Sequence, residues 1–267
     1  TEAQPDYSKL GIHLLLDDGR GSWDVALWDE HIAKAGEMLP EGGYVVQLVR
    51  ADDLDPEKWQ VFLDLAEENQ LTPIIRLATV FDEDAGVWEV PQADADGGYA
   101  TLAGDYADFI SVLDWHGESH YLILLNEPNN GHEWGGKPDA EAYSRFVMDV
   151  VHAIREADDQ AVILNGAFDL HVPNTGDAPF GDTEIYSVDA ETFMNAMQGA
   201  QPDIFRQFDM WNSHVYPLHF VEPPWKRERG FLNSQTGETI ETDAPRGVFN
   251  RSVNGYEWEL WKLSTYG

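Results

Sequence analysis

The stretch HYLILLNEP, residues 120–128, decides the fold. It begins as a continuous apolar run and ends in Asn126, Glu127 and Pro128. A run without polar alternation is typical of a strand that is buried on both faces of a parallel sheet. Apolar residues at helical spacing follow it between residues 143 and 154. The stretch therefore predicts a β/α unit whose strand ends in a carboxylate.

The same alternation of apolar runs and helical patterns extends through the chain. Further strands are predicted at residues 10–16, 44–50, 73–78, 161–165 and 208–216. Further helices are predicted at residues 22–39 with Ser22 as N-cap, from Asp55-Pro56 onward, and at residues 99–115, 189–200 and 256–266. Strands that alternate with helices indicate an α/β fold with a parallel sheet.

The expected architecture is a (β/α)8 TIM barrel of which six units are readable. Eight units of this length would need about 350 residues, whereas the chain has 267. Strands seven and eight are not found, so residues 1–267 are interpreted as a single, C-terminally incomplete barrel domain with a polar extension at residues 1–9. A nucleotide-binding fold is disfavoured because the chain has neither a G-x-G-x-x-G after its first strand nor a Walker A motif.

The composition limits the partners of the chain. Its 49 acidic and 16 basic side chains give a formal net charge of −33, which disfavours nucleic acids and anionic membranes. The absence of cysteine excludes disulfides and thiolate chemistry. The spacings of His116 with His120 and of Asp94 with Asp96 make poor metal sites, so neither a metal nor a cofactor is expected. The polar start without methionine favours a secreted, extracellular protein.

Glu127 is the strongest candidate for a catalytic residue. Pro128 is expected to hold Glu127 in an extended conformation, because proline restricts the residue before it. A carboxyl group held against apolar walls has a raised pKa and can act as a general acid near neutral pH. Asn-Glu-Pro also occurs as a plain turn. Its place after a buried strand favours the catalytic interpretation, because reactive side chains in such folds follow the strands.

Polar side chains near the other predicted strands are candidates for binding a substrate. They are His13, Arg50, Arg76, Asn165, His214 and Tyr216. By strand phase, His13 and Asn165 point either into the interior or at the site, and a buried histidine with satisfied hydrogen bonds is the commoner outcome. Trp134, which follows Glu127 closely, is the candidate for stacking against a sugar ring.

The sequence Asn126-Glu127-Pro128 resembles the signature of the 4/7 superfamily of retaining (β/α)8 glycoside hydrolases, which includes cellulases, mannanases and β-xylosidases. The resemblance covers about residues 10–217 and includes the His-x-Tyr sequence at residues 214–216. It implies that Glu127 is the acid/base and that Asn126 binds the substrate 2-hydroxyl. The implied substrate is an oligosaccharide or polysaccharide whose O-glycosidic bonds are cleaved by double displacement.

The resemblance also implies a nucleophile, beside which His214 and Tyr216 would lie and which Arg50 or Arg76 would support. A retaining mechanism needs this second carboxylate roughly 5–5.5 Å from the first. In the superfamily it follows strand seven, so it is expected beyond residue 267.

Alternatives to this interpretation stay open. Glu257 and Glu259 are alternative nucleophiles, but residues 256–266 read as a helix with both acids on its solvated side. A second possible function is a non-catalytic carbohydrate-binding or structural protein on a degenerate barrel. A third is an unrelated barrel enzyme that uses Glu127 as a general base.

Overall fold

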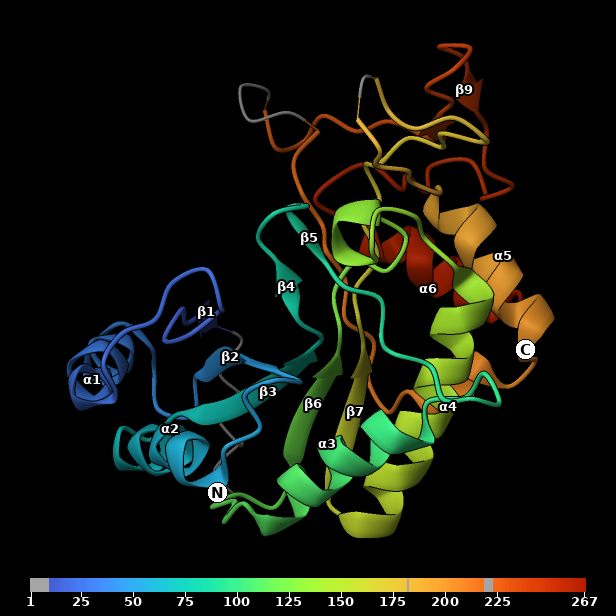
Figure 1. Cartoon of the computed structure of the whole chain (residues 1–267). Helices are drawn as coiled ribbons and strands as arrows, with labels where there is room; N and C mark the ends of the chain where they lie inside the picture. Colours follow the sequence, from blue (N-terminus) through green and yellow to red (C-terminus); the bar gives the residue numbers. More distant parts are fainter. Residues whose placement is uncertain (1–9, 182, 219–222) are drawn as a thin grey trace. The chain divides into compact units, whose positions relative to one another are not determined.

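The computed structural model describes residues 10–181, 183–218 and 223–267, which form two compact units (Figure 1). The first unit contains Gln92–Leu124, Asp149–Ile163 and the described residues up to Phe81. The second contains Asp82–Pro91, Leu125–Met148 and the described part of Leu164–Gly267. The predicted extension at residues 1–9 lies outside the described residues. The prediction of a single domain stays a prediction.

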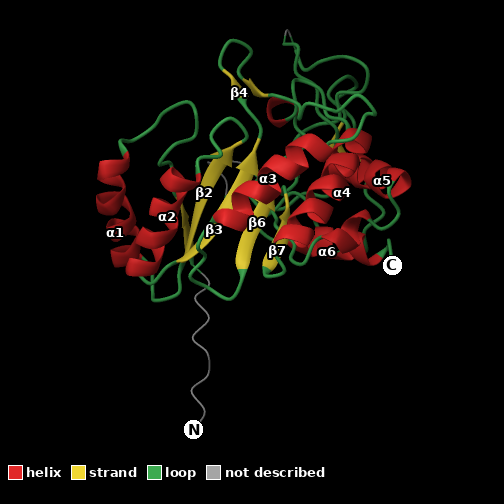
Figure 2. Cartoon of the chain, turned by 60° about the horizontal axis from the view of Figure 1, so that its bottom comes forward, coloured by secondary structure: helices red, strands yellow, loops and turns green. Residues whose placement is uncertain are grey.

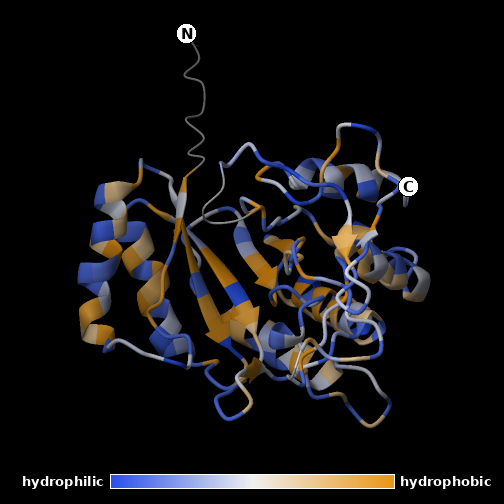
Figure 3. Cartoon of the chain, turned by 90° about the horizontal axis from the view of Figure 1, so that it is seen from above, coloured by the Kyte–Doolittle hydropathy of each residue, from blue (hydrophilic) through white to orange (hydrophobic). Residues whose placement is uncertain are grey.

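A five-stranded sheet forms the centre of the first unit. Its strands are β1 (Gly11–His13), β2 (Tyr44–Arg50), β3 (Thr72–Ala78), β6 (His120–Leu124) and β7 (Ala161–Asn165), in that order. The pairs β1–β2, β2–β3 and β3–β6 are parallel. The strands are mostly hydrophobic, as their orange colour in Figure 3 shows, and the middle five residues of β2 are buried. The predicted α/β fold with a parallel sheet is thereby confirmed.

The α-helices of the first unit bury their apolar stripes. They are α1 (Trp28–Met38), α2 (Pro56–Glu68) and α3 (Ala100–Val112), and the short η1 (Val25–Leu27) precedes α1. Figure 2 shows α1 and α2 side by side, and their Trp28 and Trp59 rings lie 5.4 Å apart. Asp55 caps α2 as predicted, because its carboxylate accepts the Glu57 N–H at 3.0 Å. The prediction of Ser22 as an N-cap is wrong: Asp24 caps η1, and α1 begins after it.

Strand β1 is shorter than the predicted strand at residues 10–16. The Leu14 N–H still donates to the Val46 carbonyl at 2.8 Å, and beyond it the buried amide of Gln47 takes over the hydrogen bonding of the backbone. Its Oε1 accepts the Leu16 N–H at 3.1 Å, and its Nε2 donates to the Asp17 carbonyl at 2.9 Å. The chain after β1 is therefore held by a side chain of β2, since a buried backbone needs hydrogen-bond partners.

Short strands and helices surround the core of the second unit. The elements in or entering it are β4 (Phe81–Asp82), β5 (Val87–Trp88), η2 (Gly131–Glu133), α4 (Ala140–Ala157), α5 (Ala190–Ala200), η3 (Ile204–Gln207), β8 (Phe231–Leu232), β9 (Thr239–Ile240) and α6 (Tyr256–Ser264). The pairs β4–β5 and β8–β9 form at residues 81–88 and 231–240, where the sequence analysis predicts neither a strand nor a helix. Tyr143 of α4 stacks near Phe146 and contacts Phe193 of α5, which anchors the two helices in this core.

The predicted sixth strand, residues 208–216, does not form a regular strand. It makes two isolated parallel bridges in the second unit, between Leu164 and Met210 and between Asp169 and His214. Among the described residues the sheet remains open, with β1 and β7 at its edges. The closed barrel and its eightfold count are therefore not shown.

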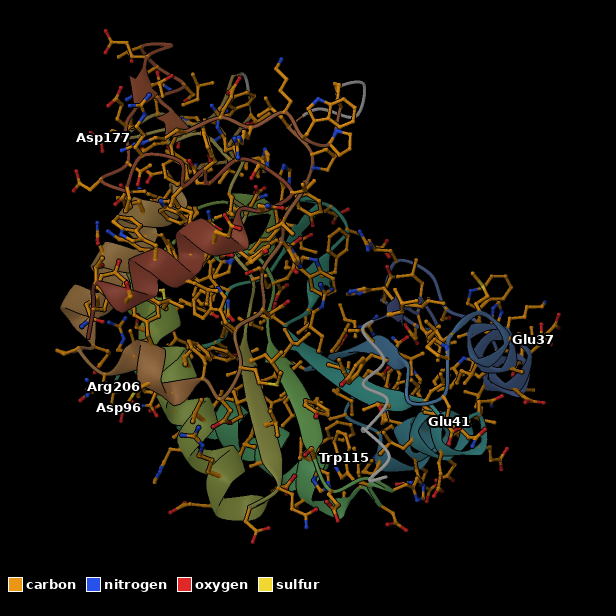
Figure 4. The ribbon with its side chains drawn as sticks, turned by 180° about the vertical axis from the view of Figure 1, so that it is seen from behind. Glu37, Glu41, Asp96, Trp115, Asp177 and Arg206 are labelled. Atoms are coloured by element: carbon orange, nitrogen blue, oxygen red, sulfur yellow. The ribbon has the colours of Figure 1, made fainter. Side chains whose placement is uncertain are left out.

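The acidic excess lies at the surface. Glu37 near the end of α1 and Glu41 in the turn after it are exposed, and so is Asp177 in a loop of the second unit (Figure 4). In the part of the chain that the structure describes, no helix is long and apolar enough to cross a membrane.

Candidate active site

Glu127 and His214 form the centre of the candidate site, within the second unit. The Oε1 atom of Glu127 lies 2.6 Å from Nδ1 of His214. The side chains are 13% and 21% exposed, so the pair is sheltered but keeps some contact with solvent. The Asn-Glu-Pro and His-x-Tyr sequences, 87 residues apart, thus meet in space.

The backbone at Glu127 adopts a left-handed conformation. Its φ is +34°, and that of Leu125 is +64°. The expectation of an extended Glu127 is therefore wrong. Backbone bonds hold the turn: the Glu127 N–H donates to the Ala167 carbonyl at 2.9 Å, and the Glu127 carbonyl accepts from Asn130 at 2.8 Å. Non-glycine residues held at positive φ are uncommon and cluster at functional sites.

Asp169 is a site residue that the sequence analysis missed. Burial and, second to it, the negative charge of Glu127 together raise its pKa from 3.8 to about 6. Its Oδ1 atom accepts the backbone N–H groups of His171 at 2.7 Å and Val172 at 3.2 Å. A carboxyl group with this pKa exchanges protons near neutral pH. The only sequence signal for it is an acid four residues after the apolar run at residues 161–165.

Asn129 fixes the backbone of Asp169. It is fully buried, its Oδ1 accepts the Asp169 N–H at 2.9 Å, and its Nδ2 donates to the Asp169 carbonyl at 2.8 Å. The loop after Glu127 and the loop that carries Asp169 are therefore tied together by one amide. Asn129 was not among the predicted site residues.

Tyr216 lies beside Glu127 and His214 and is the most exposed of the three residues. Its side chain is hydrogen-bonded to Glu127, and its ring centroid lies 5.7 Å from that of His214. Burial, followed by the charges of Glu127 and Asp169, raises the pKa of Tyr216 to about 12. The phenol therefore stays protonated and can donate to a ligand or to Glu127.

Other predicted binding residues of the second unit have structural contacts. Asn126, directly before Glu127, is half-buried. Asn165 is fully buried, donates to the Asn212 carbonyl at 3.0 Å and accepts the Asn212 N–H at 2.7 Å. Trp134 is 1% exposed and packs edge-on against Tyr143 with a centroid distance of 5.8 Å. This burial contradicts the prediction of Trp134 as an open stacking surface.

The remaining predicted residues belong to the first unit. His13 is exposed at the end of β1, and Arg76 lies in β3, paired in register with Leu48 and Ile123. The guanidinium of Arg50 contacts the Asp52 carboxylate at 2.7 Å and that of Asp17 at 3.6 Å. Within this unit, Arg50 therefore neutralises neighbouring acids.

The two acids of α6 differ sharply from each other. Glu257 is exposed, as expected, but Glu259 is 0% exposed, so the expectation that both face solvent is wrong. The Ser213 hydroxyl donates to Oε2 of Glu259. Burial raises the pKa of Glu259 to about 8, although the Ser213 hydroxyl and the Trp211 indole oppose the shift.

His116 and His120, whose spacing resembles that of a metal-binding pair, are both paired with acidic side chains of the protein. Nδ1 of His120 lies 2.7 Å from an Asp158 oxygen, and its ring stacks on Trp115. His116 lies between Asp64 and Glu67, at 2.9 and 3.0 Å. Among residues 10–181, 183–218 and 223–267, no cluster of three or more histidine or acidic side chains could hold a metal ion.

Comparisons with known proteins include a distant structural likeness. No family model and no curated protein matches the chain. A solved structure, D-allulose 3-epimerase from Methylomonas sp., matches with 16% sequence identity and a TM-score of 0.37. The match covers 80% of this chain and 64% of the epimerase, so the chain spans less than two thirds of that protein.

These findings correct the functional interpretation of the sequence. The structural match is an epimerase, whereas the predicted relatives are hydrolases. Membership of the 4/7 superfamily is contradicted, and the prediction of a retaining glycoside hydrolase is wrong. The alternative of a non-catalytic carbohydrate-binding protein finds no support either. The secreted location stays a prediction.

Proposed function

We propose that the second unit carries the acid–base centre of an enzyme that transfers protons on a neutral, hydroxylated substrate. Glu127 is the general base and Asp169 the general acid. The observation that carries the proposal is the contact of 2.6 Å between Glu127 and His214, beside an Asp169 carboxyl whose pKa is about 6. Carboxyl groups with different environments divide acid and base roles in this way.

The two carboxyl groups are unequal in their surroundings. Glu127 faces the imidazole of His214 and the phenol of Tyr216, which stabilise a negative charge by hydrogen bonding. Both backbone bonds to Asp169 fall on Oδ1, which leaves Oδ2 to carry a proton. One group is thus suited to accept a proton and the other to deliver one.

The charges around the site favour a neutral substrate. Glu127, Asp169 and Glu133 all act on Tyr216 electrostatically, and the whole chain has a formal net charge of −33. An anionic ligand would be repelled from such surroundings. Hydroxyl groups, in contrast, can donate to carboxylates and accept from Tyr216. Neutral aldoses and ketoses have this chemistry, together with a carbonyl that acidifies the neighbouring C–H bond.

Deuterium exchange tests the proposal directly. The protein is incubated with a panel of neutral aldoses and ketoses in D2O, and incorporation at carbon is followed by NMR. Glu127→Gln and Asp169→Asn are each expected to slow exchange about 100-fold or more, which is the usual contribution of one acid–base group. Glu184→Gln, an exposed acid of the same unit, is the matched control and should leave the rate unchanged.

Two outcomes would overturn this function. One is the absence of exchange with every sugar of the panel in the wild-type protein. The other is a rate in Glu127→Gln equal to that of the Glu184→Gln control.

A further inference from the structure

The segment from Trp211 to Tyr216 is held from both sides by side chains. Asn212 faces Asn165, and His214 faces Glu127, whereas Ser213 faces Glu259 of α6. This alternation is what an extended chain produces, because successive side chains point in opposite directions. The side of the segment opposite the candidate site is therefore fastened to α6 at Ser213.

Glu259 makes this contact with Ser213 from a fully buried position. It is 0% exposed, its Oε2 accepts the Ser213 hydroxyl, and the Trp211 indole of the same segment also lowers its pKa. Trp211 is itself packed among Phe168, Phe205 and Phe208, with centroid distances of 5.7, 6.0 and 6.0 Å. A displacement of Glu259 would thus be transmitted to Ser213, the residue next to His214.

We propose that Glu259 is a positioning residue that holds Ser213 and thereby sets His214 against Glu127. The proposal rests on the proposed function only in taking His214 and Glu127 as the reactive pair. Glu259 acts through Ser213 and is given no contact with the substrate.

The protonation of Glu259 controls this contact. Burial raises its pKa to about 8, so the carboxyl is neutral at pH 7 and ionises in mildly alkaline solution. The groups facing it from the Trp211–Ser213 segment are uncharged. On its own helix, Glu257 is exposed and Lys262 pairs with Glu191 of α5 at 2.8 Å. A buried negative charge without a cationic partner is costly, so ionisation favours a local opening between α6 and the segment.

The ring signals of His214 in NMR spectra report this opening without any assay of activity. They are followed from about pH 6 to about pH 10 in the wild type, Glu259→Gln, Glu259→Ala and Glu257→Gln. In the wild type we expect the His214 signals to shift with a midpoint near the Glu259 pKa of about 8. Glu259→Gln, which stays neutral, should lose this step, and Glu259→Ala should displace the signals at every pH. Glu257→Gln should behave as the wild type.

Persistence of the alkaline step in Glu259→Gln would overturn the inference, and so would unchanged His214 signals in a folded Glu259→Ala protein. If Glu259→Ala does not fold, the glutamine variant alone decides, since it preserves shape and hydrogen bonding. Failure of the proposed function has a different signature. Sugars would then show no deuterium exchange while the His214 titration still followed Glu259.

Discussion

Two extended segments of the protein are held in opposite ways. All seven residues of β2 pair with β3 through a regular parallel register, from Tyr44 with Thr72 to Arg50 with Ala78. The segment at residues 208–216 has only two isolated bridges in the described structure. Asn165, Glu127 and Glu259 hold it by their side chains instead.

The difference affects how each segment responds to its surroundings. Backbone bonds of the β2–β3 kind involve no titratable group, so their strength does not follow pH. The irregular segment is held partly by Glu127 and Glu259, and Asp169 makes a bridge to it, so protonation acts directly on its contacts. The segment that carries His214 therefore has a geometry that protonation can adjust, and it lacks the regular pairing of a strand.

Removing the side-chain amide of Asn165, which holds Asn212, should have the largest effect on the free energy of unfolding. Asn165→Leu keeps the volume of the buried side chain but leaves the N–H and carbonyl of Asn212 without their partner. We expect the free energy of unfolding to fall by about 2–4 kcal/mol, because two partly buried backbone groups lose their hydrogen bonds. Urea denaturation measures this change. Asn254→Leu, at an exposed asparagine, is the control and should cost less than about 0.5 kcal/mol. Equal costs at the two positions would show that side chains do not hold the segment.

The ionisation of Asp169 should have an intermediate effect on the free energy of unfolding. Its pKa is about 6 in the folded protein against 3.8 without the fold, so the unfolded chain loses the proton first as the pH rises. Stability is therefore lost between about pH 4 and pH 6 and stays lower above that range. The asparagine of Asp169→Asn cannot ionise, so this loss of stability does not occur in the variant. Its amide oxygen still accepts the His171 N–H. We expect the variant to be more stable than the wild type by about 2 kcal/mol at neutral pH.

The gain from Asp169→Asn should be about 1 kcal/mol larger at about pH 7.5 than at about pH 5, since one pKa unit corresponds to about 1.4 kcal/mol. Urea denaturation at the two pH values gives the difference. A gain that is the same at both would mean that Asp169 titrates normally in the folded protein.

The smallest effect is expected in the first unit, where the regular sheet lies. The pKa of His116 is raised by its hydrogen bond to Asp64, although burial opposes the shift, and by the charge of Glu67. The stabilisation is complete below the ordinary pKa of 6.5 and is lost as the pH rises through the raised value. His116→Gln should cost about 0.5 kcal/mol near pH 6 and almost nothing near pH 9.

Thermal unfolding at the two pH values measures the effect of His116→Gln. His152→Gln is the control, because His152 is an exposed residue of α4 that lies 3.6 Å from Glu156. A loss as large as that of Asn165→Leu would remove the contrast between the two units.

The regular parts of the fold could be predicted because their signals are local. Apolar runs located β2, β3, β6 and β7 to within two residues, and Asp55-Pro56 gave the start of α2. The sixth strand could not be predicted correctly, because its apolar pattern does not reveal that Asn165 occupies the hydrogen bonds of Asn212. The early end of β1 could not be predicted for the same reason, since the residues after it are held by Gln47, which is distant in the sequence.

The candidate site was predictable only in part. The motifs indicated Glu127, His214 and Tyr216, which do lie together. Asp169 and Glu259 gave no comparable signal, because their importance comes from burial and from neighbours that are distant in sequence. Trp134 was misjudged because an indole beside a motif serves a core as readily as a ligand.

The left-handed backbone at Glu127 also has a consequence for engineering. A glycine would suit its φ of +34° better than any residue with a side chain, and the difference is worth about 1 kcal/mol. As far as the backbone is concerned, selection for heat resistance therefore favours Glu127→Gly. Selection for turnover, in contrast, requires the carboxylate. A library screened for thermal tolerance would set this gain against the lost contact with His214, while one screened for turnover would keep the proposed base despite the strain.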